Sequence, residues 1–195
     1  MLKRFFDILC SGIGLLILSP LFLLVAIWGK CDSQGPVFYR QIRVGRFGKD
    51  FKLFKFRSMR VGSDKKGLIT VGGHDPRITR SGYFIRKYKL DELPQLINVF
   101  IGDMSLVGPR PEVRRYVDLY TPEQLHVLDV RPGITDLASI RYRNENEILG
   151  SVEDPDRYYI EVIMPDKLRI NLDYVAHHSC FGDLKIIFQT FMAIL

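Results

Sequence analysis

A chain of 195 residues is long enough for one ordinary globular core, and no Gly/Ser-rich linker, low-complexity tract or internal repeat divides it. Its 28 Lys and Arg residues outnumber 22 Asp and Glu residues, and the net charge of +6 favours an anionic partner such as an acidic lipid surface, phosphorylated substrates or nucleic acid. Three scattered cysteines without a CxxC spacing argue against a disulfide framework and a zinc site, and favour a reducing compartment.

The first predicted element is a membrane segment. Residues 8–28 form a run of 21 positions without a charge. At about 1.5 Å per residue, such a helix reaches across the roughly 30 Å hydrocarbon core of a bilayer, so a spanning anchor is one interpretation. However, Pro20 lies near the middle, where it removes a helix hydrogen bond and leaves the Leu16 carbonyl without its backbone donor. The Ser19 hydroxyl can help to satisfy the freed backbone locally. We therefore predict a helix break at Ser19-Pro20.

Charge on the two flanks favours a helix that does not cross the bilayer. Lys3 and Arg4 precede the segment and Lys30 follows it, so both flanks carry the basic residues that mark a cytoplasmic side. We therefore predict a re-entrant membrane helix over residues 1–30, which enters, bends and leaves by the cytoplasmic face. Residues 31–195 are predicted to form one cytoplasmic domain.

The middle of the chain predicts a helix-rich α+β domain with a small β-sheet. Alternating apolar and basic residues over 54–57 predict a strand, and residues 104–107, bounded by turn residues, predict a second. The sequence Thr-Pro-Glu-Gln at 121–124 is a capping box with proline at the first helical position. Asp-Pro at 154–155 likewise begins a helix, which Pro165 is expected to interrupt.

Two segments have apolar faces suited to a membrane surface. Residues 84–89 interleave apolar and basic side chains, and the last fifteen residues, 181–195, have a broad apolar face opposite Lys185 and Gln189. Each is interpreted either as part of the core or as an interfacial amphipathic helix lying on the membrane.

Residues 89–100 carry the pattern most informative about chemistry. A helical stripe starts at Leu93, and Pro94 is tolerated only in the first turn of that helix, which places Asp91 at or next to the helix N-terminus. Free N–H groups and the positive end of the helix dipole favour an anion there. One interpretation is that Asp91 merely caps the helix. The other is that Asp91 and Glu92 form a paired carboxylate site beside cations that hold phosphates.

Arginines in constrained loops supply those cations. Arg110 lies between Pro109 and Pro111, and such a rigid loop suits a guanidinium that meets phosphate oxygens bidentately. Arg131, followed by Pro132, repeats the arrangement. The residues predicted to bind phosphate or substrate are Lys55, Arg57, Arg77, Arg86, Arg110, Arg131 and Arg143.

Several common site types are missing from the sequence. It contains no P-loop, no Rossmann GxGxxG, no HExxH and no GxSxG motif. The basic residues interleave with membrane-like apolar stretches and not with a nucleic-acid reader motif, so nucleic acid is not expected as a partner.

Ordered motifs over nearly the whole chain resemble those of one family. They are KRFFD (3–7), SP (19–20), GPVFYRQ (35–41), FKFRSM (54–59), DPRIT (75–79), RKYKLDELPQ (86–95), GDMSLVGPRPE (102–112) and VRPGIT (130–135). By these motifs, the chain is similar to the small monotopic phosphoglycosyl transferases of the bacterial sugar transferase family.

The resemblance implies an activity and a location. A sugar-1-phosphate would pass from a UDP-sugar to undecaprenyl phosphate with release of UMP, as the first membrane step of bacterial glycoconjugate assembly. Residues 31–195 would be the catalytic domain, on the cytoplasmic face of the inner membrane. The catalytic residues would be Asp91 and Glu92, with Mg²⁺ held by Asp91. In the implied ping-pong mechanism, Asp91 attacks the β-phosphorus of the donor and carries the phosphosugar covalently.

One stretch departs from the family pattern. After residue 135 many relatives have Gly-Trp, and later Asn-Gly-Arg-Asn. Here Arg143 keeps its place, whereas Asp136, Leu137, Arg141 and Tyr142 do not match. The departure affects the expected sugar and nucleotide selectivity and not the reaction class. An N-acetylated amino sugar is the expectation from the resemblance to small stand-alone members.

Two functions of other classes stay open. One is a non-catalytic membrane-anchored scaffold that binds nucleotide-sugars, against which the intact Asp91-Glu92 pair argues. The other is a Mg²⁺-dependent phosphohydrolase that uses the same pair with water as acceptor, and release of UMP without a lipid product would favour it. Membrane lipids are expected partners, while the sequence leaves the sugar, the pathway and a homodimer undetermined.

Overall fold

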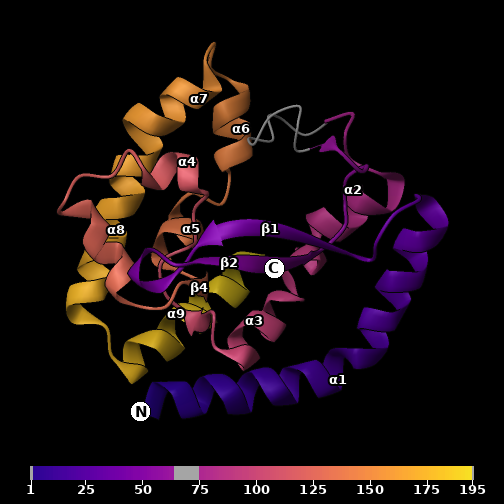
Figure 1. Ribbon diagram of the computed structural model, residues 1–195, viewed down its shortest axis with the longest axis horizontal. Coiled ribbons are helices and arrows are strands. Elements are labelled where there is room, and N and C mark those ends of the chain that lie inside the picture. The colour runs from indigo at the N-terminus through magenta and orange to yellow at the C-terminus, as the bar shows by residue number, and fades with distance from the viewer. Residues whose placement is uncertain (1, 64–74, 195) are drawn as a thin grey trace.

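The computed structural model describes residues 2–63 and 75–194 of the chain (Figure 1). In chain order the helices are α1 (Leu2–Asp32), α2 (Arg80–Lys87), α3 (Gln95–Ile101), α4 (Arg114–Val117), α5 (Leu137–Arg141), α6 (Glu145–Gly150), α7 (Pro155–Tyr158), α8 (Met164–His177) and α9 (Cys180–Ile194). The strands are β1 (Phe38–Val44), β2 (Asp50–Phe56), β3 (Ser105–Val107) and β4 (Gly133–Thr135). Shorter turns are the 3₁₀ segments η1 (Arg46–Gly48), η3 (Leu90–Glu92) and η4 (Gln124–Asp129), and the π-helical η5 (Tyr159–Ile163). The predicted helix-rich α+β class is confirmed.

The predicted strands are confirmed, but they belong to two separate ladders within the described ranges. β1 and β2 form an antiparallel hairpin that contains most of the predicted strand at 54–57. β3, predicted at 104–107, pairs in parallel with β4, which lies far along the chain. The two backbones approach so closely after β3 that a Cβ atom on Gly133 would lie 2.1 Å from the Gly108 nitrogen, so glycine is required there.

Helix α1 contains the predicted break. Figure 1 shows it running along the lower edge of the molecule and then turning upward along the right side. Pro20 lies inside it, and the Ser19 hydroxyl donates to the Leu16 carbonyl at 2.8 Å, as the sequence predicts. Among the described residues, α1 is the helix long and apolar enough to cross a membrane, and it is largely exposed. The structure therefore confirms a kinked apolar helix.

The start of α1 is tied to the rest of the protein by polar side chains. The Asp7 carboxylate is buried and accepts hydrogen bonds from the Ser105 hydroxyl (3.0 Å) and the Leu106 amide (2.9 Å) of β3. Lys3 pairs with Asp183 of α9. These contacts hold the first turns of α1 against the ends of β3 and α9.

The end of α1 is tied to α2. The Asp32 carboxylate accepts from the amide and hydroxyl of Ser81 in α2, both at 2.8 Å. The Trp28 ring lies 5.3 Å from the Phe84 ring. Both ends of the apolar helix therefore contact elements that follow it in the chain.

Two predicted helix starts are confirmed in their local geometry. Thr121 and Gln124 exchange the two hydrogen bonds of a capping box, although the turn that follows is the 3₁₀ segment η4. Asp154 caps α7 by accepting from the Arg157 amide at 3.0 Å. The expected interruption takes the form of a π turn, since the α-helix α7 ends at Tyr158 and η5 separates it from α8. The chain continues through the π turn η5 into α8, and Pro165 lies in the first turn of α8, where its missing N–H costs little.

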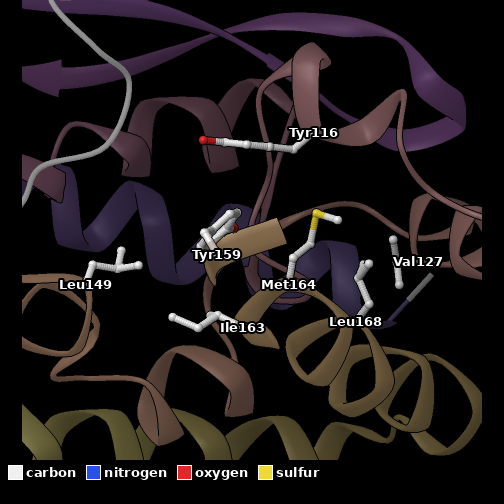
Figure 2. Close-up of a cluster of buried hydrophobic side chains, with 7 residues drawn as sticks. All are labelled: Tyr116, Val127, Leu149, Tyr159, Ile163, Met164 and Leu168. Carbon is white, nitrogen blue, oxygen red and sulfur yellow. The ribbon is translucent and has the colours of Figure 1, made fainter. Parts of the chain in front are cut away.

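The largest buried cluster joins the second half of the chain. Figure 2 shows its members, Tyr116, Val127, Leu149, Tyr159, Ile163, Met164 and Leu168. A second cluster, of Val25, Phe56 and Ile85, packs the second half of α1 against β2 and α2. Leu53 of β2 packs on Val99 of α3 in a third. These contacts fix α3 beneath the hairpin and so place η3, which precedes α3.

Candidate active site

A large open cleft brings together nearly all the predicted site residues. Its volume is about 1350 Å³, and the hairpin, η3, the loop after β3 and the segment around α5 and α6 contribute to its walls. Its lining includes eight of the nine predicted residues, namely Lys55, Arg57, Arg77, Arg86, Asp91, Glu92, Arg110 and Arg143. Arg131 is the exception, since it does not line the cleft in the described part of the chain.

Both carboxylates lie in the 3₁₀ turn η3. Lys89, in the left-handed region at φ 55°, turns the chain from the end of α2 into η3, and Pro94 precedes the first residue of α3. Neither η3 nor α3 has a side-chain cap. The interpretation of Asp91 as only a helix cap therefore has no support in this geometry.

Glu92 is held by two cations. Arg110 meets it with a two-pronged contact, in which Nη1 lies 3.2 Å from Oε2 and Nη2 lies 2.5 Å from Oε1. The Lys55 ammonium lies 3.3 Å from Oε1. Burial opposes ionisation of Glu92, but Arg110 and then Lys55 outweigh it and hold the pKa of the carboxyl well below its usual range. Glu92 is therefore an ionised carboxylate at neutral pH.

Asp91 has the opposite environment. Its side chain is buried, with 7% exposed, and has no hydrogen-bond or ion-pair partner within residues 2–63 and 75–194. Burial raises the pKa of Asp91 above its usual value, the Lys55 charge opposes the shift, and the neighbouring Glu92 charge adds to it. Of these two adjacent residues, Glu92 is bound by cations, whereas the Asp91 carboxylate is available to a ligand.

Asn98, which the sequence analysis did not single out, aligns the two elements that carry the pair and Lys55. Its side-chain oxygen accepts from the Phe54 amide at 2.9 Å, and its side-chain nitrogen donates to the Lys52 carbonyl at 2.8 Å. Because Asn98 is fully buried in α3, it fixes β2 against that helix. This contact brings Lys55 of β2 to Glu92. No local pattern in the sequence distinguishes this amide from an exposed one.

Two other predicted cations line the cleft in different settings. Arg77 pairs with Asp75 through Nε (2.9 Å) and Nη2 (2.5 Å). Arg143 is exposed. Arg86 also lines the cleft, and its positive charge lowers the pKa of Asp91.

Arg57 and Arg131 bond to the ends of helices. Arg57 Nη2 donates to the Ser33 carbonyl at 2.6 Å and to the Gly29 carbonyl at 3.2 Å, at the end of α1. Arg131 Nε donates to the Gly102 carbonyl at 2.8 Å, at the end of α3 opposite to η3. The structure therefore does not bring Arg131 to the pair, and it gives Arg57 a second role as an anchor of α1.

The family model described as bacterial sugar transferase matches residues 1–195. The chain belongs to the bacterial sugar transferase family. It is 39% identical to the UDP-N-acetylgalactosamine-undecaprenyl-phosphate N-acetylgalactosaminephosphotransferase of Aeromonas hydrophila, over 100% of this chain and 44% of that protein. It is 39% identical to the UDP-glucose:undecaprenyl-phosphate glucose-1-phosphate transferase of Escherichia coli K12, over 97% of this chain and 39% of that protein. It is 36% identical to the exopolysaccharide production protein ExoY of Rhizobium meliloti, over 100% of this chain and 85% of that protein. The chain thus spans less than half the length of the first two relatives and most of the third.

The residues of the cleft fit the ion that the family resemblance implies. Within the described ranges, no group of three or more His, Cys, Asp or Glu side chains is arranged to hold a metal. Mg²⁺ does not require such a cage, since it keeps several waters and binds through one or two carboxylates plus substrate phosphates. Asp91 is the carboxylate that is available for this role, because Arg110 and Lys55 already hold Glu92.

The segment that departs from the family pattern forms one wall of the same cleft. Asp136 is buried and caps α5 by accepting from the Ser139 amide at 2.8 Å. The Tyr142 hydroxyl donates to Asp166 at 2.8 Å. Asp136 and Tyr142 both line the cleft. The departures therefore change a wall of the site, while the Asp91-Glu92 pair remains.

Proposed function

We propose that this chain is a phosphoglycosyl transferase that moves a sugar-1-phosphate from a UDP-sugar to undecaprenyl phosphate. The observation that carries the proposal is the contrast between two adjacent carboxylates in a cation-lined cleft. Glu92 is bound by Arg110 and Lys55, and Asp91 is buried without such a partner in the described residues. The printed names of the relatives, which specify UDP-sugars and undecaprenyl phosphate, support the choice of substrates.

The proposed reaction has two steps at the same phosphorus. In the first, a carboxylate oxygen of Asp91 attacks the β-phosphorus of the donor, the bond from that phosphorus to the bridging oxygen breaks, and UMP leaves with the electron pair. In the second, a phosphate oxygen of undecaprenyl phosphate attacks the acyl phosphosugar and the Asp91 carboxylate is released. Splitting the transfer in this way is covalent catalysis by a carboxylate.

The surrounding residues support both steps by charge. Glu92 orients Arg110 and Lys55, and these two cations would neutralise the oxygens of the transferred phosphoryl group. Mg²⁺ bound at Asp91 would add charge neutralisation on the phosphates. Burial makes the Asp91 carboxylate more basic than an exposed aspartate, which favours its use as a nucleophile.

We also propose that the protein is monotopic, with its catalytic part on the cytoplasmic face of the inner membrane. Both ends of α1 bind elements of the same protein, through Asp7 and Lys3 at the start and Asp32 at the end. If α1 crossed the bilayer, one of these sets of contacts would have to break. Exposed apolar residues of α2 and α9, such as Phe84 and Phe188, support interfacial contact next to α1.

A panel of radiolabelled UDP-sugars with undecaprenyl phosphate and Mg²⁺ tests the activity and names the sugar. The relatives divide between N-acetylgalactosamine and glucose donors, so the panel includes both, together with the expected N-acetylated amino sugars. The same incubation without lipid tests the covalent step. It should release UMP and leave a phosphosugar on the peptide that contains Asp91, visible by mass spectrometry after a brief acid quench.

Substitutions at Asp91 sharpen that test. Asp91→Asn cannot attack, and Asp91→Glu moves the attacking oxygen, a misplacement that can cost about 10²-fold. Both should be nearly inactive and form no adduct, whereas Asp118→Asn, at an exposed position outside the cleft lining, should behave as wild type. If UMP appears only when lipid is present and no adduct forms, transfer is direct. If UMP is released and water alone is the acceptor, the protein is a phosphohydrolase.

A further inference from the structure

The carboxylate of Glu112, two residues after Arg110, is bonded from two sides. Arg43 Nη1 of β1 lies 3.5 Å from Glu112 Oε2. On the other side, the Tyr159 hydroxyl donates to Glu112 Oε1. The Glu112 and Arg43 side chains are largely buried, and Tyr159 is 4% exposed. Neither Arg43 nor Tyr159 has a role in the two steps proposed above.

Strand β1 also holds the backbone of this loop. Arg43 Nη1 donates to the Pro111 carbonyl at 2.9 Å, and the Val44 amide donates to the Glu112 carbonyl at 2.9 Å. The Arg43 guanidinium is itself oriented by the Gln41 side-chain oxygen, which accepts from Nε at 3.0 Å and from Nη2 at 2.8 Å. The two positions that follow Arg110 are therefore fixed to β1.

Tyr159 brings the second half of the chain to the same loop. It is the first residue of the π turn η5, and π turns recur at functional positions of helices. Its ring lies 4.9 Å from that of Tyr116, in the cluster of Figure 2, and the Lys167 ammonium lies 5.4 Å from its centre. Burial and the nearby Glu112 charge raise the pKa of Tyr159, so the hydroxyl keeps its proton and stays a donor.

Glu112 is a second carboxylate near Arg110 in the chain, two residues after it. The Glu112 charge raises the pKa of Arg110, as the charge of Glu92 does more strongly, so a Glu112 carboxylate without partners of its own would attract the same guanidinium. With Arg43 and the Tyr159 hydroxyl on its two oxygens, Glu112 is satisfied. Arg110 is then left to make its fork with Glu92.

We infer that Arg43 and Tyr159 are positioning residues that act through Glu112 to keep Arg110 on the catalytic pair. The inference rests on the proposed function, in which Arg110 neutralises the transferred phosphoryl group. It predicts that removing the Tyr159 hydroxyl impairs the reaction although that hydroxyl does not touch the reacting atoms.

The test is Tyr159→Phe, which keeps the ring and its packing. Single-turnover release of UMP should slow about tenfold, since a small misplacement of a charge-stabilising group is costly. KM for the UDP-sugar should stay within about twofold, because the loss falls on the transition state. The matched control is Tyr116→Phe. Tyr116 belongs to the same cluster as Tyr159, and its hydroxyl also donates to a carboxylate, Asp156 Oδ1 at 2.8 Å. Loss of the Tyr116 hydroxyl should leave the rate unchanged.

A double-mutant cycle separates positioning from general damage. Arg110→Lys should lose most of the activity, because lysine lacks the bidentate fork. If Tyr159 acts through Arg110, adding Tyr159→Phe to Arg110→Lys should cost nothing more. An equal loss in both backgrounds, or no loss in the wild-type background, overturns the inference. Glu112→Gln weakens the contact with Arg43, and adding it to Arg110→Lys should likewise cause no further loss of activity.

A second measurement does not depend on activity. Hydrogen exchange of the peptide over residues 105–115 should be faster in Tyr159→Phe and unchanged in Tyr116→Phe, and equal exchange in all three proteins would contradict the inference. If the wild-type protein releases UMP from no UDP-sugar, the proposed function fails, and the exchange data still decide whether Tyr159 holds this loop.

Discussion

At the scale of single residues, Asp91 and Glu92 show how neighbours in the chain acquire opposite properties. Both are buried beside Lys55, and burial alone would raise the pKa of each. The Arg110 fork reaches only Glu92, so that carboxyl titrates well below its usual range while the pKa of Asp91 is raised. Carboxyl pairs whose pKa values are pushed apart can take different roles, which is consistent with the proposal that Glu92 orients the cations and Asp91 is the nucleophile.

The raised pKa of Asp91 predicts the pH dependence of UMP release. Protonated Asp91 cannot attack, so the rate should fall as pH drops through a pKa above the ordinary value of 3.8. The Lys55 charge lowers that pKa, so Lys55→Met should move the acid limb of the rate profile to higher pH, apart from any loss of rate. Because the pKa of Glu92 is low, it adds no limb in this range.

The measurement is single-turnover UMP release from pH 4 upward, with each profile scaled to its own plateau. Lys52→Met is the matched control, since this lysine is on the same strand but exposed, and its profile should overlay that of the wild type. An acid limb that stays in place or moves to lower pH in Lys55→Met would contradict the assignment of Asp91.

At the scale of elements, α1 combines a local break with long-range ties. Pro20 removes a helix hydrogen bond wherever it occurs inside a helix, and the Ser19 hydroxyl accommodates the Leu16 carbonyl. Arg4 adds to the ties at the start of α1 by donating to the Val99 and Phe100 carbonyls at the end of α3. The break permits α1 to bend, and the bend allows both ends of α1 to contact the rest of the protein.

Replacing Ser19 by Ala and Pro20 by Leu together should straighten α1 and shift the segment towards spanning the membrane. A single-cysteine tag at the N-terminus should then react from the periplasm in a measurable fraction of molecules, whereas in the unaltered protein it should react only from the cytoplasm. Cys10, Cys31 and Cys180 are exposed and have to be replaced first.

The control for this topology test keeps the proline. Ile17 and Leu23 are 68% and 61% exposed in the same helix, and Ile17→Ala with Leu23→Ala should leave the tag on the cytoplasmic side. Periplasmic labelling of the unaltered protein would rule out the re-entrant helix.

At the scale of the whole molecule, exposed apolar side chains gather on four helices. They are Leu2, Phe5, Phe6, Ile8, Leu9, Ile13, Leu16, Ile17, Leu23, Leu24, Ile27 and Trp28 of α1, Phe84 of α2, Phe100 and Ile101 of α3, and Phe181, Leu184, Ile187, Phe188, Phe191 and Met192 of α9. Figure 1 places α1, α3 and α9 toward the same lower side of the molecule. A surface of this extent is typical of contact with a membrane.

Charged substitutions in α9 test this surface. Phe188→Glu with Phe191→Glu should raise KM for undecaprenyl phosphate more than tenfold, since burying each phenylalanine contributes about 1.5–3 kcal/mol. UMP release in the absence of lipid should not change, because neither residue lines the cleft. The control is Leu125→Glu with Val162→Glu, two exposed apolar positions in η4 and η5. An unchanged KM in the α9 variant would exclude α9 from the membrane contact.

The sequence by itself determined the features that depend on neighbours within about one helical turn. These are the break at Ser19-Pro20, the capping box at 121–124, the strands in β2 and β3, and the adjacent carboxylates in the family motif. Each follows from proline geometry, hydrogen bonds three or four residues long, or side-chain alternation. The same local rules predicted an interruption at Pro165, and the structure has the π turn η5 directly before α8 and Pro165 in the first turn of α8.

The tertiary structure alone decided which charges meet. Arg110 and Glu92 are 18 residues apart, Lys55 and Glu92 are 37 apart, and Tyr159 and Glu112 are 47 apart. The flanking prolines singled out Arg110 in the sequence, but no local feature told the other predicted arginines apart. In the structure Arg57 and Arg131 bond to helix ends, and Arg110 pairs with Glu92. No periodicity encodes such pairs, because they form only when the buried clusters fix α3, the hairpin and the η5 turn against one another, and burial then makes each contact energetically decisive.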